Sequence, residues 1–136
     1  MNTQHKPTYI SLFSSAGVGC YGFKMAGFDC IATNELLERR LNIQRYNQKC
    51  KYPGGYICGD ITQEQTKKLL YDQLELWKAK EHLSRVDVVI ATPPCQGMSI
   101  ANQKKTDTEI VRNSLVVESI KIIQKINPRF FVFENV

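Results

Sequence analysis

The sequence lacks several features that would assign it to whole classes of protein. No apolar run approaches the length that spans a membrane, and residues 1–7 contain no apolar core of a signal peptide. The five cysteines are odd in number and form no C-x-x-C pair, which argues against a disulfide framework or a zinc site and favours a reducing cytoplasm. Repeats and low-complexity segments are also absent. We therefore expect no membrane partner, no metal and a cytoplasmic location.

The composition fits one globular domain with a basic surface. The chain has 136 residues, and 43% hydrophobic content is enough to build one core. A net charge of +5 allows a polyanionic partner, but an ordinary basic surface has the same balance. Composition therefore leaves the partner open.

Short apolar runs alternate with helical patterns along the whole chain. The expected strands are 9–13, 30–33, 56–58, 86–92 and 130–133. The expected helices are one that ends near Gly27, one over 36–48, one that begins after an N-cap at Thr62, and one over 108–126. This alternation predicts an α/β fold, a doubly wound and mostly parallel sheet. With strand order 3-2-1-4-5, ligands would bind between the first and fourth strands, at their carboxyl ends.

The two later helices each show a stripe of apolar residues that we expect to face the core. In the third helix the stripe comprises Leu69, Leu70, Leu74 and Trp77. In the fourth it comprises Val111, Leu115, Val116, Ile120, Ile123 and Ile126.

The most informative segment is Pro93-Pro94-Cys95-Gln96, directly after the fourth apolar run. Each proline fixes its own φ and removes a backbone donor, so the strand stops and a thiol follows its carboxyl end. A nucleophile would be well placed there, although a small buried cysteine in a proline-rich turn fits the same residues.

Other strand ends carry residues that suit a nucleotide-type ligand. The small-residue turn 14–19 follows the first strand, Glu35 the second and Asp60 the third. Backbone N–H groups in such a turn favour an anion, and an acid after the second strand accepts hydrogen bonds from ribose hydroxyls. Each feature alone could be a tight turn or a helix cap, but together they favour an adenosine-containing cofactor. Glu134 ends the fifth strand, beside the expected position of Cys95.

Taken in order, these segments resemble the cytosine-C5 methyltransferase family, which uses S-adenosylmethionine (SAM). The resemblance covers essentially the whole chain and rests on Leu12-Phe13-Ser14-Ser15-Ala16-Gly17, Asn34-Glu35, Gly59-Asp60-Ile61, Pro93-Pro94-Cys95-Gln96-Gly97-Met98-Ser99 and Glu134-Asn135-Val136. It implies a partial SAM-dependent methyltransferase catalytic domain over residues 1–136, with a Rossmann-like fold.

The resemblance also implies roles for individual residues. Cys95 would add to C6 of a cytosine, and Glu134 would hold or protonate its N3. The residues implied in cofactor binding are Phe13, Ser14, Ala16, Gly17, Glu35, Leu36, Asp60, Ile61 and Pro93. Those implied in substrate binding are Pro94, Gln96, Ser99 and Asn135. Lys104 and Lys105 would lie near the phosphates of the nucleic acid.

The implied activity is methyl transfer from SAM to a cytosine flipped out of double-stranded DNA, in a bacterial, nucleoid-associated restriction-modification enzyme. A tRNA cytosine-C5 methyltransferase and a SAM-binding subunit of a split enzyme remain alternatives. The resemblance further implies that a C-terminal part with the target-recognition region, or a complementary subunit, completes the enzyme. Strand 130–133 would then form an unpaired apolar edge that promotes self-association.

Three positions depart from the family pattern. The family usually has an acid at the position of Ser11 and glycines at those of Ser15 and Val18. Because serine stands in place of this acid, we expect that the strand end lacks the anchor that the acid would provide. Ser15 and Val18 should narrow the space around the cofactor without preventing its binding.

Overall fold

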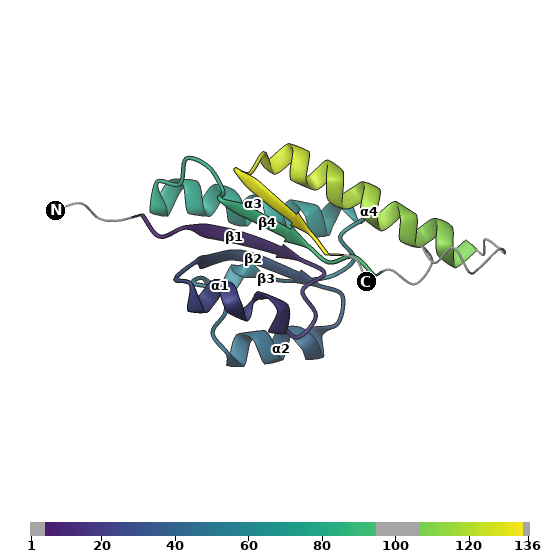
Figure 1. Ribbon diagram of the computed structural model, residues 1–136, viewed down its shortest axis with the longest axis horizontal. Helices are drawn as coiled ribbons and strands as arrows, with labels where there is room; N and C mark the ends of the chain where they lie inside the picture. Colours follow the sequence, from purple (N-terminus) through teal and green to yellow (C-terminus); the bar gives the residue numbers. More distant parts are fainter. Residues whose placement is uncertain (1–4, 95–106, 135–136) are drawn as a thin grey trace.

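The computed structural model describes residues 5–94 and 107–134, and in these residues five parallel strands form one sheet between helices (Figure 1). The strands are β1 (Thr8–Leu12), β2 (Asp29–Glu35), β3 (Tyr56–Cys58), β4 (Val88–Ala91) and β5 (Phe130–Phe133). The α-helices are α1 (Tyr21–Met25), α2 (Glu38–Tyr46), α3 (Glu64–Glu81) and α4 (Asp107–Ile126). Two 3₁₀ turns, η1 (Val18–Cys20) and η2 (Pro53–Gly55), precede α1 and β3.

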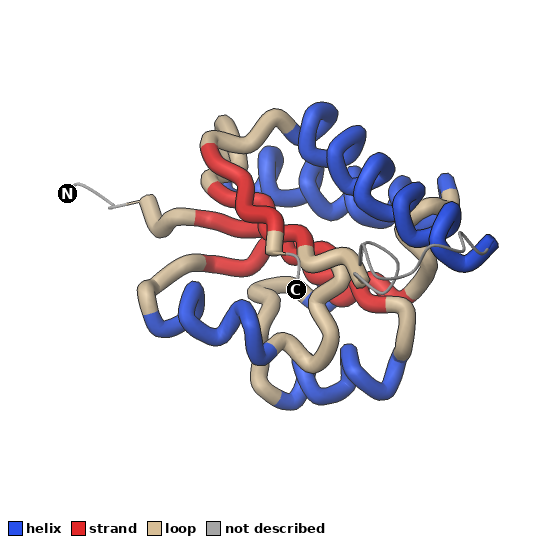
Figure 2. The backbone as a smooth tube through the Cα atoms, turned by 45° about the vertical axis from the view of Figure 1, so that its right-hand side comes forward, coloured by secondary structure: helices blue, strands red, loops and turns tan. Residues whose placement is uncertain are grey.

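The strand order is β3-β2-β1-β4-β5, and all four neighbouring pairs are parallel. This confirms the predicted order and the doubly wound α/β class. The chain reverses its direction of winding between β1 and β4, so the carboxyl ends of these two strands border a crevice. Helices α3 and α4 cover one face of the sheet, and α1 and α2 cover the other (Figures 1 and 2).

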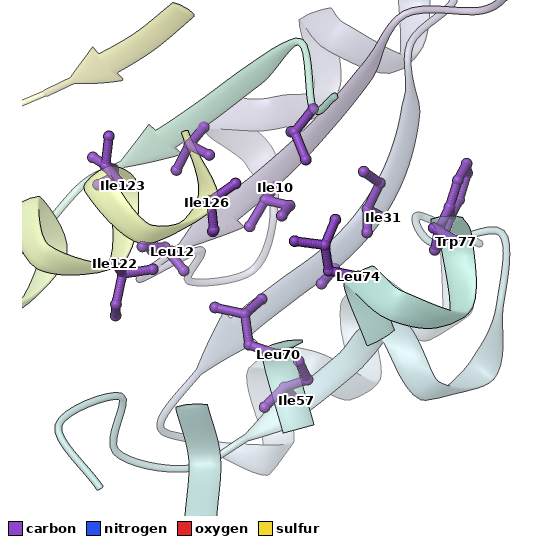
Figure 3. Packing of buried hydrophobic residues seen from close by; sticks show 14 of the residues in the cluster. Ile10, Leu12, Ile31, Ile57, Leu70, Leu74, Trp77, Ile122, Ile123 and Ile126 are labelled. Carbon is purple, nitrogen blue, oxygen red and sulfur yellow. The ribbon is translucent and has the colours of Figure 1, made fainter. Parts of the chain in front are cut away.

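The larger part of the core lies under α3 and α4. Because side chains alternate along a strand, Ile10 and Leu12 of β1 point to this face, where they join residues of both helices (Figure 3). The helix residues of this cluster include Leu70, Leu74, Trp77, Ile122, Ile123 and Ile126. Each such aliphatic side chain contributes roughly 1.5–3 kcal/mol when fully buried.

A smaller cluster lies on the opposite face, under η1 and α1. Tyr9 of β1 points to this side, and its ring stacks on Phe23 of α1 with centroids 4.8 Å apart. The other buried members are Cys20, Cys30, Cys50, Val88 and Ile90. Three of the four free cysteines in the described residues are therefore core side chains on this face.

Several predicted details are wrong. Leu69 and Ile120 are 48% and 44% exposed, because the buried stripe of α3 runs through Thr66 and Leu70 and that of α4 through Ser119 and Ile122. Thr62 is not the N-cap of α3: the helix begins at Glu64, one residue after its N-cap Gln63.

Element bounds also shift. The first helix is a 3₁₀ turn followed by five residues that end at Met25, and β2 continues to Glu35. Strand β1 ends at Leu12, one residue before Phe13, and β4 begins at Val88. The side chain of Val111 lies outside those described.

Strand β5 leaves an apolar edge. Within the described residues it pairs only with β4, and Phe130, Phe131 and Val132 are exposed. An unpaired apolar edge is a template for further strand pairing. In the part of the chain described here, no helix is long and apolar enough to cross a membrane.

Candidate cofactor and catalytic site

The turn after β1 has an unusual backbone. Phe13 and Ser15 have φ values of 56° and 52°, and Gly17 has a φ of 84°. A left-handed conformation is uncommon outside glycine, and each such residue costs on the order of 1–3 kcal/mol. Thr92, at the end of β4, holds the start of the turn: its hydroxyl donates to the Phe13 carbonyl at 2.9 Å. The turn therefore depends on its surroundings for its shape.

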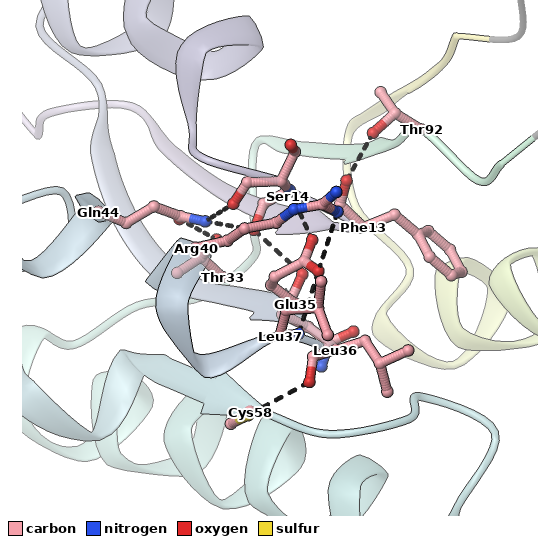
Figure 4. A network of polar contacts seen from close by, with 12 residues as sticks. Phe13, Ser14, Thr33, Glu35, Leu36, Leu37, Arg40, Gln44, Cys58 and Thr92 are labelled. Atoms are coloured by element: carbon pink, nitrogen blue, oxygen red, sulfur yellow. Dashed lines mark hydrogen bonds and ion pairs between the residues drawn. The ribbon is translucent and has the colours of Figure 1, made fainter. Parts of the chain in front are cut away.

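Gln44 of α2 fixes the centre of this turn (Figure 4). Its side chain is 1% exposed, and its Nε2 donates to Ser14 Oγ at 2.8 Å and to the Ser15 carbonyl at 2.5 Å. The backbone N–H and the hydroxyl of Ser14 both donate to the Asn34 carbonyl at 3.0 Å. Gly17 leaves the space that Gln44 occupies, since a Cβ on Gly17 would lie 3.0 Å from Gln44 Cγ. The second strand and second helix thus shape the turn together.

The other end of the Gln44 amide is also occupied. Its Oε1 accepts from Lys49 Nζ at 3.1 Å, and Thr33 Oγ1 lies 2.7 Å from both Gln44 Oε1 and Ser14 Oγ. Lys49 Nζ also donates to Thr33 Oγ1 at 3.0 Å. Burying an amide costs little free energy only when its donors and its acceptor form hydrogen bonds. This network supplies those hydrogen bonds.

Glu35, at the end of β2, is a buried carboxylate aimed at the turn. Its Oε2 accepts from the Ser15 N–H at 2.8 Å, and its Oε1 accepts from the Leu37 N–H at 3.1 Å. Arg40 Nη1 lies 3.4 Å from Oε1 and balances the charge. Two carboxylate oxygens offer about four acceptor positions, so Glu35 keeps one for a further donor.

Asn34 connects the second strand to the loop after β3. Its Nδ2 donates to the carbonyls of Ile57 at 3.1 Å and Gly59 at 3.0 Å. In that loop, Asp60 Oδ1 accepts from the N–H of Thr62 at 2.9 Å and from its hydroxyl at 2.8 Å. Asp60 is exposed, and its Oδ2 has no partner among the described residues. That oxygen can accept a hydrogen bond from a ligand.

Among the described residues, two cavities share a border at the carboxyl ends of the strands. The larger is about 470 Å³ and is lined by Phe13, Ser15, Asn34, Glu35, Leu36, Arg40, Gly59, Asp60, Ile61, Thr92, Pro94 and Leu115. The smaller is about 360 Å³ and is lined by Phe13, Ser14, Ser15, Ala16, Val18, Gly19, Cys20, Ile90, Thr92, Pro93, Pro94 and Glu134. Phe13, Ser15, Thr92 and Pro94 belong to both.

The structure brings most of the predicted site residues to these two cavities. Of the predicted cofactor residues, Phe13, Glu35, Leu36, Asp60 and Ile61 line the larger cavity, and Ser14, Ala16 and Pro93 line the smaller one. Gly17 lines neither of them; together with Gln44 it lines a third cavity of about 320 Å³. Their roles stay predictions.

Glu134 reaches the smaller cavity from the end of β5. Its backbone N–H donates to the Ala91 carbonyl at 3.1 Å, which continues the pairing with β4, and its side chain is exposed. Pro93 and Pro94 line the same cavity and directly precede Cys95. Cys95, Gln96, Ser99, Lys104, Lys105 and Asn135 lie outside the described residues.

Reasoning from the sequence did not identify Arg40, Gln44 and Thr92 as parts of the site. Arg40 and Thr92 line the larger cavity, and Gln44 supports its wall. The sequence contained a feature that could have identified Thr92, since this residue directly precedes the two prolines. Gln44 had none, because a glutamine on a helix is ordinarily exposed and only its burial against the turn shows its role.

The three departures from the family pattern have different surroundings. The Ser11 side chain is buried, with Oγ 3.2 Å from Cys20 Sγ, and it lines neither cavity. Ser15 lines both cavities and has a positive φ, a conformation for which glycine carries no strain. Val18 is exposed at the smaller cavity.

The doubly wound sheet and the cavities at its switch point place the protein among Rossmann-like α/β proteins, which bind ligands at this position. Comparison with known sequences gives the family. Residues 8–136 match the model of the C-5 cytosine-specific DNA methylase family. The chain belongs to this family, which confirms the resemblance seen in the sequence.

Curated relatives have methyltransferase names. The type II methyltransferase M1.HgaI of Avibacterium volantium is 35% identical over 131 residues, which are 93% of this chain and 34% of that protein. M1.HphI of Haemophilus parahaemolyticus is 35% identical over 95% of this chain and 32% of its own length. M.AquIA of Picosynechococcus sp. is 36% identical over 93% of this chain and 47% of its own length. The chain thus spans about a third to a half of these relatives.

Solved structures support the fold. The crystal structure titled as a DNA modification methyltransferase encoded within an E. coli prophage matches with a TM-score of 0.67 at 24% identity, over 96% of this chain and 32% of that one. An NADPH-dependent reductase involved in bacilysin biosynthesis matches with a TM-score of 0.64 at 14% identity, over 96% of this chain and 55% of that one. At these identities the likeness concerns the Rossmann-like fold alone.

Proposed function

We propose that this chain is the cofactor-binding and catalytic part of a type II DNA cytosine-C5 methyltransferase that uses SAM. The observation that carries the proposal is the shared border of the two cavities. One contains the Glu35 and Asp60 carboxylates, and the other contains Glu134 and the prolines that precede Cys95. A methyl donor in the first would therefore lie next to a base in the second.

The larger cavity suits an adenosine-type cofactor. Glu35 keeps one acceptor position for a ribose hydroxyl, and Asp60 Oδ2 can accept from the adenine amino group. Phe13, Ile61 and Leu115 supply apolar wall around the rings. When bound, SAM supplies an electrophilic methyl group on its sulfonium.

The chemistry assigned to this chain begins at Cys95. Its thiolate adds to C6 of cytosine, so that a sulfur–carbon bond forms and C5 gains the electron density that it lacks in the aromatic ring. C5 then takes the methyl group. Loss of the C5 proton and departure of the thiolate restore the C5–C6 double bond. An ordinary thiol has a pKa of about 8.5, so the surroundings of Cys95 must favour its thiolate at neutral pH.

Glu134 is assigned to the N3 side of the base. A carboxyl group there holds or protonates N3, which draws electrons from the ring and favours addition at C6. The base reaches the site only after it leaves the duplex, so flipping of the target cytosine is part of the proposal. The basic balance of the chain suits the phosphates of double-stranded DNA.

Labelled methyl transfer from SAM tests the proposal, with duplex DNA and tRNA offered in parallel. We expect transfer to duplex DNA, its loss in Cys95→Ser, and its retention in the control Cys58→Ser at an exposed thiol. Transfer to tRNA alone would contradict the DNA assignment. SAM binding is measured separately by calorimetry. Binding without transfer to either substrate would favour the alternative of a SAM-binding subunit that needs a complementary part.

A further inference from the structure

Two buried thiols lie against each other on the face of the sheet that α1 and α2 cover. Cys30 of β2 and Cys50, four residues after the end of α2, have their Sγ atoms 3.6 Å apart. They are 1% and 9% exposed, and both are free thiols. Neither takes part in the proposed methyl transfer.

The backbone already holds the two residues at a distance that a disulfide requires. Cys30 and Cys50 form an isolated parallel β-bridge, so their Cα atoms have the spacing of neighbouring strands, about 4.8 Å. Disulfides join Cα atoms about 4.4–6.8 Å apart. The sulfur atoms need to approach only from 3.6 Å to about 2.05 Å.

The surroundings favour one of the thiols as the nucleophile. Burial raises the pKa of Cys30, but the hydrogen bond from the Cys50 thiol, the charge of Lys49 and the Tyr9 hydroxyl outweigh burial and leave this pKa below its ordinary value. The hydrogen bond to Cys30 and burial raise the pKa of Cys50. A cavity of about 320 Å³ is lined by Tyr9, Cys20 and Lys49 among others, so it borders the two side chains whose hydroxyl and charge act on Cys30.

We propose that Cys30 and Cys50 are a thiol modification site, which hydrogen peroxide converts into an intramolecular disulfide. The Cys30 thiolate attacks the peroxide O–O bond: a sulfur–oxygen bond forms, the O–O bond breaks and the leaving hydroxide is protonated to water. Cys50 sulfur then attacks Cys30 sulfur, the S–S bond forms, and the sulfenic oxygen leaves as water with the Cys50 proton. Two thiols are oxidised by two electrons, and one hydrogen peroxide is reduced to two waters.

The disulfide would act on the turn after β1 through Lys49, the residue before Cys50. Lys49 Nζ donates to Gln44 Oε1 at 3.1 Å and to Thr33 Oγ1 at 3.0 Å, and Gln44 holds Ser14 and Ser15. The S–S bond removes the negative charge on Cys30 that Lys49 stabilises, so Lys49 is held less firmly at this position and the network loosens. This step rests on the proposed function, and we expect oxidation to weaken SAM binding roughly fivefold or more.

Peptide mapping of the peroxide-treated protein tests the modification without reference to activity. We expect a linked peptide pair that contains Cys30 and Cys50 and is about 2 Da lighter than the two free peptides, because oxidation removes two protons and two electrons. The pair should persist in the control Cys20→Ser, a buried thiol of the same cluster, and reverse with dithiothreitol. It should disappear in Cys30→Ser and Cys50→Ser.

Mapping of the wild-type protein alone can overturn the proposal, even if a serine variant fails to fold. Unlinked Cys30 and Cys50, at a peroxide dose that oxidises exposed Cys58, would refute the modification, as would a preference for other cysteine pairs. Calorimetry with SAM then compares the reduced and oxidised forms. Equal affinities would refute the coupling to the turn. Failure of the reduced protein to bind SAM would count against the proposed function instead.

Discussion

The buried amide of Gln44 offers the sharpest test of how this fold positions the turn after β1. Replacing it by leucine, Gln44→Leu, keeps a side chain of similar size and removes every polar contact that the amide makes. The lost contacts are those from Nε2 to Ser14 Oγ and to the Ser15 carbonyl, and those to Oε1 from Lys49 and from Thr33.

The expected loss of unfolding free energy follows from these four contacts. At roughly 0.5–1.5 kcal/mol each, they sum to about 2–6 kcal/mol. Ser14 and Thr33 can still bond each other at 2.7 Å, and Lys49 is partly exposed and can turn to water. The Ser15 carbonyl is left as the main uncompensated group. We therefore expect the free energy of unfolding to fall by about 2–3 kcal/mol, in the lower half of that range.

Urea unfolding followed by circular dichroism measures this change. With a slope of about 1–3 kcal/mol per molar urea, the midpoint should fall by roughly 1–2 M at an unchanged slope. The matched control is Arg39→Leu, an exposed position on the same helix, where we expect a change of less than about 0.5 kcal/mol. If Gln44→Leu matches this control, the amide does not hold the turn and the reasoning is refuted.

Four further changes test other parts of the structure. Ser15→Gly relieves a φ of 52° and should raise the unfolding free energy by roughly 0.5–1 kcal/mol in thermal melts. An unchanged or lower value would contradict strain at this position. Glu35→Gln keeps the shape but removes the charge, so calorimetry should show SAM affinity lower by about tenfold; unchanged affinity would exclude it from the ribose site. Phe131→Lys places a charge on the exposed β5 edge and should abolish any self-association in light scattering, whereas a wild-type monomer at micromolar concentration would contradict edge pairing. Ile122→Ala should lower the free energy of unfolding by about 2–5 kcal/mol, measured by urea unfolding. The exposed control Val117→Ala should lower it by less than about 0.5 kcal/mol, and equal losses would place Ile122 outside the core.

The parts of the fold that were predictable from the sequence are those set by local pattern. The bounds of β3 and β5 match the prediction because glycine and proline residues precede these short apolar runs. The helix faces were less predictable. Leu69 and Ile120 continue an apolar pattern but are exposed, since the sheet determines which side of a helix is buried and Thr66 and Ser119 lie on that side.

The same distinction applies to the site. Glu35 and Asp60 were predictable, because a topological rule places strand ends at the ligand crevice. Gln44 was not, because its importance depends on a contact across 29 residues with the Ser15 carbonyl. No periodicity or motif encodes that contact.

The turn after β1 combines strain and support in a way that suits a binding site. Phe13 and Ser15 adopt positive φ, and the chain holds them there through Thr92 of the switch-point strand, Glu35 of β2 and Gln44 of α2. Strained residues persist only where neighbouring elements determine their geometry. Because Phe13 and Ser15 line both cavities, one piece of backbone forms part of the wall of the larger cavity and part of the wall of the smaller cavity that Glu134 also lines. A shift of this turn therefore changes the walls of both cavities together. If the proposed function holds, substitutions at Gln44 should affect SAM binding and methyl transfer in parallel.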